Sequence, residues 1–128
     1  MNPLTREWVS KAEGDFVTAS RELRARKSPN YDAACFHAQQ CAEKYMKALL
    51  HAAGIAFQKT HDLESLLGQV VAIDPSWEML RPDLEALTTH AVAVRYPGWS
   101  MNRAVARGAL ATAREVRRRA RLHLRLRG

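Results

Sequence analysis

Residues 31–53 constrain the fold most, because a helix over them is apolar around most of its circumference. Gly54 follows as a natural C-cap residue. A helix of this kind is stable only when other helices cover it, so the stretch predicts the central helix of a helical protein. Its apolar positions are Ala34, Cys35, Ala38, Cys41, Ala42, Tyr45, Met46, Ala48, Leu49 and Leu50.

Two segments before residue 75 also carry apolar residues at helical spacing, and neither alternates as a strand would. The first ends before Ser28-Pro29 and starts at Thr5 or at Asn2, the latter with Pro3 as its first helical residue. The other is a short amphipathic helix that we expect to start at Thr60 as its N-cap.

The remaining two segments are predicted helices over residues 77–94 and 102–126. Pro82 lies within the former and either bends it or marks its true start. We therefore predict an all-α fold, an up-and-down antiparallel four-helix bundle with an extra short helix, as one domain over residues 1–128. The predicted packing stripe of the last helix is Met101, Val105, Ala109, Thr112, Val116 and Ala120.

Composition excludes several classes of protein. No apolar run reaches the length of a membrane span, and residues 1–7 lack the apolar core of a signal peptide, which predicts a soluble cytoplasmic protein without a membrane partner. The two cysteines, Cys35 and Cys41, are six positions apart on one helix and project to different sides. No pair of residues has metal-ligand spacing, so we expect no metal and no other cofactor.

The net charge of +7 is concentrated at the C-terminal end, where residues 95–128 hold ten arginines and one acid, Glu115. On a helical wheel most of these arginines share about 100°, opposite the packing stripe. This basic face is either a solvated surface or a site for RNA or an acidic partner. It consists of Arg103, Arg107, Arg114, Arg117, Arg118, Arg121 and Arg125.

The polar residues of the central helix form a stripe of about 80° on the same wheel. One interpretation is that the stripe is the solvent-facing side that a bundle helix needs, and an i,i+4 pair of Glu43 with Lys47 favours it. The other is a phosphate or nucleotide site, in which the lysines bind phosphates and the other side chains bond a base or ribose. The stripe comprises His37, Gln40, Lys44, Lys47 and His51.

Two further candidate sites lie at predicted helix ends. His61 and Asp62 follow Thr60, where they serve either local capping or an anion site with His61 as a donor. Arg95 and Tyr96 precede Pro97 at a helix stop that needs neither of them, so Arg95 is a candidate phosphate ligand and Tyr96 a candidate for base stacking. Trp99, in the same loop, is a candidate exposed contact.

Four motifs in order resemble the HEPN family, the "higher eukaryotes and prokaryotes nucleotide-binding" domain. They are residues 37–50 (HAQQCAEKYMKALL), 12–15 (AEGD), 60–63 (THDL) and 95–97 (RYP). The resemblance covers about residues 5–125. It implies a helical bundle, often dimeric, and for many bacterial and archaeal members a small nucleotidyltransferase partner in a toxin–antitoxin-type pair.

Other members of the family are RNases that use an Arg-x(4–6)-His motif near the start of the last long helix. Here Arg95 occupies that place, but no histidine follows it at that spacing; Arg118 and His123 match the spacing only near the C-terminus. We therefore favour a non-catalytic module that binds a nucleotide or RNA through Lys44, Lys47 and Arg95, with His61 and Tyr96 at the site edge.

Two alternatives stay open. One is a metal-independent homodimeric RNase that uses Arg95 with His61 or His123. The other is a structural adaptor whose basic face docks on an acidic partner.

Overall fold

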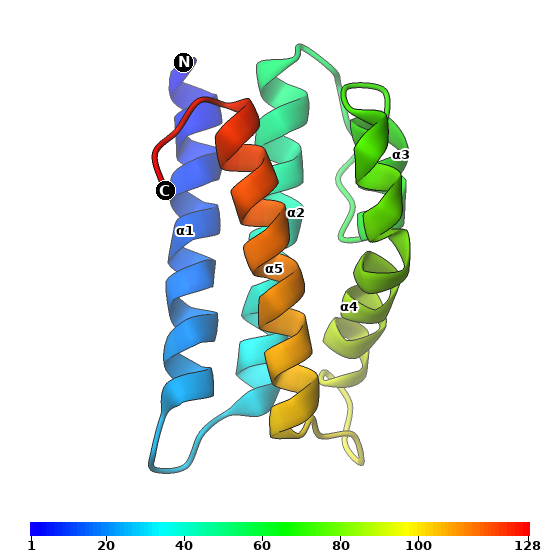
Figure 1. Cartoon of the computed structure of the whole chain (residues 1–128). Helices are drawn as coiled ribbons and strands as arrows, with labels where there is room; N and C mark the ends of the chain where they lie inside the picture. Colours follow the sequence, from blue (N-terminus) through cyan, green and yellow to red (C-terminus); the bar gives the residue numbers. More distant parts are fainter.

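The structure, a computed structural model, describes all 128 residues and is built entirely from helices (Figure 1). The predicted all-α bundle is confirmed. Successive long helices run up and down, and the short helix α3 with the 3₁₀ turn η1 precedes α4 on the descending side. The elements are α1 (Pro3–Arg24), α2 (Tyr31–Ala52), α3 (Leu63–Val70), η1 (Pro75–Leu80), α4 (Arg81–Ala93) and α5 (Arg103–His123).

Helix α2 lies at the centre and packs against α1, α3, α4 and α5. Its side chains from Cys41 to Leu50 are buried on nearly every side, Lys44 excepted, as the apolar circumference of the sequence predicts. One core of 27 buried apolar residues joins the four long helices with α3 and η1. The α2 helix ends where Gly54 adopts a left-handed conformation, with φ of 72°.

Short polar side chains set most helix starts. Asn2 caps α1 with Pro3 at the first position, whereas Thr5 is buried and its Oγ1 lies 2.6 Å from Nδ1 of His51. The predicted cap of α3 is wrong by two residues: Asp62 is the N-cap, and Thr60 instead accepts a hydrogen bond from the Asp62 amide.

The predicted helix over residues 77–94 divides at Pro82. Residues up to Leu80 form the 3₁₀ turn η1, and α4 begins at Arg81 with the proline in its first turn, where the missing amide donor breaks no helical bond. Pro82 thus marks the start of α4. The helix ends at Ala93, before the Arg95-Tyr96-Pro97 segment.

Helix α5 begins at Arg103, within one residue of the predicted start, with Asn102 as its N-cap, but it ends at His123 rather than near Leu126. Arg125 turns the chain with φ of 59°, so the segment folds back and the Leu126 amide bonds the Arg121 carbonyl. Half of the predicted packing stripe is buried, and the buried face lies about one position further round the helix. The buried residues of α5 are Ala106, Ala109, Leu110, Ala113, Val116 and Ala120.

None of the helices is both long and apolar enough to cross a membrane.

Candidate phosphate-binding site

The first half of the α2 polar stripe meets a carboxylate of α1. Asp15 is 8% exposed and takes both partners at once: Nδ1 of His37 lies 2.8 Å from Oδ1, and Nζ of Lys44 lies 2.6 Å from Oδ2. The three side chains form an ion cluster between α1 and α2. The charge of Lys44 is therefore matched within the chain.

The second half of the stripe gathers around Glu43, which is itself buried. Nζ of Lys47 lies 3.0 Å from its Oε2, and Nδ1 of His61 lies 2.9 Å from its Oε1. Lys47 is 6% exposed and its ammonium group lies 5.4 Å from the ring centre of Trp8. The predicted i,i+4 pair of Glu43 with Lys47 is present. Of the five stripe residues only Lys47 is buried, and the other four stay partly exposed.

Gln40 belongs to the same hydrogen-bond network. Its amide donates to Oε1 of Gln39, and the amide of Gln39 donates to the His61 carbonyl oxygen. His61 is thus fixed from two sides, by its ring to Glu43 and by its backbone to Gln39. The network connects the segment before α3 to α2. Gln40 and His61 therefore both have a structural role.

The basic face of α5 divides into two parts. In its C-terminal half, Arg117 and Arg121 contact Glu13 of α1, at 2.6 and 3.4 Å. Tyr45 also donates a hydrogen bond to Glu13. Partial burial raises the pKa of Glu13, but the hydrogen bonds from Arg117 and Tyr45 outweigh it, so the net pKa lies below the usual range.

Glu115 forms ion pairs with two neighbouring arginines of the same half. It lies 2.6 Å from Arg118 and 2.8 Å from Arg119, and the hydrogen bonds from Arg118 and then Arg119 lower its pKa to about 2. The arginines of α5 before Glu115 are different. Arg103, Arg107 and Arg114 have no carboxylate partner, and only Arg114 has an aromatic neighbour, with its guanidinium 5.9 Å from the ring centre of Phe16.

The loop between α4 and α5 presents Arg95, Tyr96 and Trp99. Tyr96 and Trp99 are 60% and 61% exposed, as expected for contact residues. The Arg95 guanidinium lies 5.9 Å from the ring centre of Phe36 on α2 and has no carboxylate partner. The loop is held at its far end by Asp32 of α2, whose Oδ1 accepts a 2.7 Å hydrogen bond from the Met101 amide.

The residues of the RNase hypothesis are dispersed within one chain. Arg95 precedes α5 and His123 ends it, at opposite ends of a helix of about 30 Å. His61 is held by Glu43, about 10 Å along α2 from the Phe36 that Arg95 covers. No two of these three side chains come together in the protomer.

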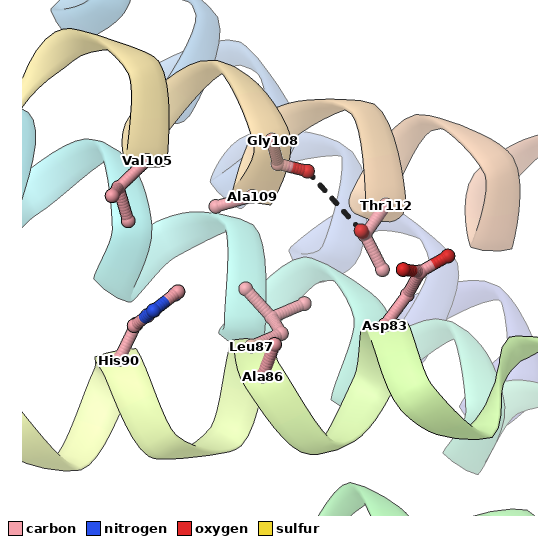
Figure 2. Close-up of a pocket in the computed structure, with 8 residues that line it drawn as sticks. All are labelled: Asp83, Ala86, Leu87, His90, Val105, Gly108, Ala109 and Thr112. Carbon is pink, nitrogen blue, oxygen red and sulfur yellow. Dashed lines mark hydrogen bonds between the residues drawn. The ribbon is translucent and has the colours of Figure 1, made fainter.

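A groove of about 180 Å³ separates α4 from α5, and sequence reasoning missed it (Figure 2). Asp83 and His90 project into it from α4, two helical turns apart, opposite small residues of α5. Thr112 uses its hydroxyl to bond the Gly108 carbonyl oxygen at 3.1 Å. The two polar side chains of α4 are too far apart to act on one atom, so the groove lacks a catalytic pair.

Comparison with known proteins agrees with the bundle and its motifs. The family model of the HEPN domain matches residues 5–123. The protein named "Putative toxin MJ1304" from Methanocaldococcus jannaschii is 34% identical over 97 residues, which cover 70% of this chain and 61% of that protein. The chain thus spans less than two thirds of the length of that relative, and no solved structure matches it. Because the family model covers nearly all of the sequence, the chain belongs to the HEPN domain family.

Proposed function

We propose that this HEPN protein is a non-catalytic module that binds the phosphates of RNA or of a nucleotide with the α4–α5 loop and the start of α5. The supporting observation is the division of its positive charge. Cations on α2 and on the C-terminal half of α5 are matched by Asp15, Glu43, Glu13 and Glu115, whereas those around Arg95 have no carboxylate.

The division matters because a phosphate must compete with any carboxylate already bound to a cation. Lys47 is buried as well as paired, so a ligand that reached it would have to break its bond to Glu43 and displace the covering rings. Arg95, Arg103 and Arg107 need no such exchange. Their guanidinium groups are free to form the bidentate bonds that arginine makes with phosphate.

The exposed rings of the loop suit a single-stranded ligand. Tyr96 and Trp99 lie within four positions of Arg95, and Gly98 between them takes φ of 88°, which turns the backbone sharply. Aromatic rings beside unpaired cations are the usual means of binding unpaired bases with little sequence preference. The same loop has no histidine, which favours binding over cleavage.

The proposal extends to the cellular role. The relative from Methanocaldococcus jannaschii carries the name "Putative toxin MJ1304". We infer a cytoplasmic homodimer that acts as the toxin-like half of a toxin–antitoxin pair, with a small nucleotidyltransferase as its partner. Size-exclusion chromatography with light scattering tests the dimer, and co-purification with the nucleotidyltransferase tests the pair.

The decisive experiment measures fluorescence anisotropy with a single-stranded RNA that carries a 5′-hydroxyl. Arg95→Ala with Tyr96→Ala should weaken binding about tenfold or more, as expected when a charged hydrogen bond and a stacked base are lost. The matched control is Arg118→Ala, which removes the same charge from an arginine already bound to Glu115 and should bind like wild type. Equal losses in both variants would contradict the proposed site.

Two further measurements separate the alternatives. Lys44→Ala with Lys47→Ala should lower the stability of the fold, while the folded fraction of the variant still binds RNA and ATP or GTP. If the folded variant no longer binds these ligands, the binding site lies on α2 instead. RNA that stays intact at high protein excess supports the non-catalytic role. Cleavage that disappears in Arg95→Ala would establish the RNase instead.

A further inference from the structure

Four arginines line an open basin. Its residues come from the end of α1, the start of α2 and the start of α5, at the end of the bundle where the α4–α5 loop lies (Figure 1). The basin has a volume of about 660 Å³, within the range of small-molecule sites. Arg24 comes from the last turn of α1 and Arg26 from the loop after it. Arg103 and Arg107 come from the first turns of α5.

No acid occurs among the eight lining residues, and none of the four guanidinium groups has an ion pair or a side-chain hydrogen bond within the chain. Of the other arginines of α5, four form ion pairs with Glu13 or Glu115, and only Arg114 has no carboxylate partner. Like charges that share a concave surface repel one another until an anion enters. The basin is therefore a concentrated, uncompensated positive site.

Its frame is well defined. Arg103 and Arg107 are four positions apart and so lie on one face of α5, directly above one another. The opposite wall is the end of α1 and the turn through Pro29, and Tyr31 at the start of α2 supplies the aromatic ring of the lining. Tyr31 also packs against the core, so α1, α2 and α5 fix the position of the site.

We propose that the basin binds a triphosphate group, carried either by a free nucleoside triphosphate or by the 5′ end of an RNA. Several charges on three linked phosphates match four converging arginines, whereas the backbone of a single strand spaces its charges along its length. This inference rests on the proposed function, since it identifies which part of the RNA or nucleotide, its triphosphate group, the basin binds. Arg103 and Arg107, at the start of α5, serve both sites, whereas Arg24 and Arg26 belong to the basin alone and Arg95 and Tyr96 to the loop alone.

Calorimetric titration with inorganic triphosphate tests the site directly. Wild type should bind triphosphate at least tenfold more tightly than orthophosphate. Arg26→Ala with Arg107→Ala should weaken triphosphate binding about tenfold or more, as expected when two charged hydrogen bonds are lost. Both arginines are exposed, so the variant should keep the wild-type melting temperature.

Two control variants accompany this test. One removes two arginines elsewhere in the molecule, and the other removes the Arg95 and Tyr96 side chains of the neighbouring loop. Arg118→Ala with Arg125→Ala should leave triphosphate binding unchanged, whereas Arg95→Ala with Tyr96→Ala should weaken it less than the Arg26/Arg107 variant does. Equal weakening in all three variants, or no preference for triphosphate over orthophosphate, would overturn the proposal. Because inorganic triphosphate carries no base, failure here is distinct from failure of 5′-hydroxyl RNA to bind the loop.

The source of the group follows from paired ligands. One outcome is that RNA with a 5′-triphosphate binds more tightly than the same RNA with a 5′-hydroxyl, and that the Arg26/Arg107 variant loses this difference. The ligand of the basin is then the 5′ end of an RNA. The other outcome is that ATP or GTP binds as tightly as inorganic triphosphate, while the 5′-triphosphate does not improve RNA binding. The ligand of the basin is then a free nucleoside triphosphate.

Discussion

At the residue scale, the acids of α1 and α2 decide which cations are available. Asp15 and Glu13 each bind two or more polar groups of other helices, and Glu43 binds Lys47 of its own helix and His61 before α3. A buried charge is costly when its partner is removed, because the remaining ion keeps its desolvation cost without compensation. These pairs therefore hold helices in register, and their removal should be measured as lost stability.

Lys47→Met should lower the free energy of unfolding by about 3 kcal/mol, because it leaves the Glu43 carboxylate buried with less compensation. The double change with Glu43→Gln should recover much of this loss, since no charge remains to be stranded. Urea unfolding measures both. Lys11→Met, on the exposed side of α1, is the control and should stay within about 0.5 kcal/mol of wild type.

Glu13 should make stability depend on acid. Its pKa is lower in the folded protein than the usual value of about 4.3, so it stabilises the fold above that pH, and the contribution disappears as pH falls through the folded pKa. Glu13→Gln should therefore be destabilised at pH 7, and its difference from wild type should narrow below about pH 4. Urea midpoints at pH 7, 4 and 3 test this; a constant difference would show that the carboxylate charge is not involved.

At the scale of elements, the connection between α4 and α5 joins fold and function. Asp32 lies in the first turn of α2, yet its carboxylate binds the Met101 amide far along the chain. The bond fastens the end of the loop that presents Arg95 and Trp99. The loop is therefore positioned by α2 as well as by the two helices that it connects.

Asp32→Ala should accelerate hydrogen exchange of the backbone amide of Met101 and its neighbours, since the acceptor is lost. Asp32→Asn keeps a side-chain oxygen acceptor and is the matched control, so it should retain most of the protection. Hydrogen exchange followed by mass spectrometry on a peptide covering residues 95–102 measures both. Equal exchange in Asp32→Ala and wild type would mean that the loop is fixed by other contacts.

Helical periodicity is sufficient to predict the elements, because the core of a bundle repeats along each helix. It is less informative at their ends. Thr60 and Asp62 are both good caps, and only the path of the chain over α2 decides between them. Pro82 marks a helix start rather than a bend, because the residues before it form a 3₁₀ turn that buries Trp77 and Leu80.

The candidate site was harder to predict, since a wheel shows where a side chain points but not what meets it. The α2 stripe has the composition of a solvated face or of a ligand site, and only the structure shows that Asp15 of another helix contacts its His37 and Lys44. The basin likewise combines Arg24 and Arg26 with two arginines almost 80 positions away. A single sequence does not show which distant segments of the chain lie side by side in the fold, so neither cluster could be predicted from it.

At the scale of the whole molecule, the continuous core protects both thiols. Cys35 and Cys41 are buried, and burial followed by the charge of Asp32 raises the pKa of Cys35 to about 11, while burial also raises that of Cys41. The reactive thiolate is therefore scarce at neutral pH. Both thiols belong to the helix at the centre of the core.

Labelling of these thiols by a maleimide should report global unfolding. We expect no labelling in native buffer over the time in which the denatured protein reacts completely, and a midpoint in urea that coincides with loss of helical circular dichroism. A Cys35→Ala variant separates the two sites. Labelling of either thiol well below the unfolding midpoint would reveal local opening of α2.

The unequal neutralisation of α5 also gives the molecule an electrical polarity along its long axis. At the end with the basin and the Arg95 loop the arginines have no carboxylate partner, whereas four arginines in the second half of α5 share the carboxylates of Glu13 and Glu115. In the field of a polyanion such a molecule experiences a torque before any contact forms. It should therefore approach with this end first, so that encounters are already oriented and the association rate exceeds that of a protein with the same net charge evenly spread.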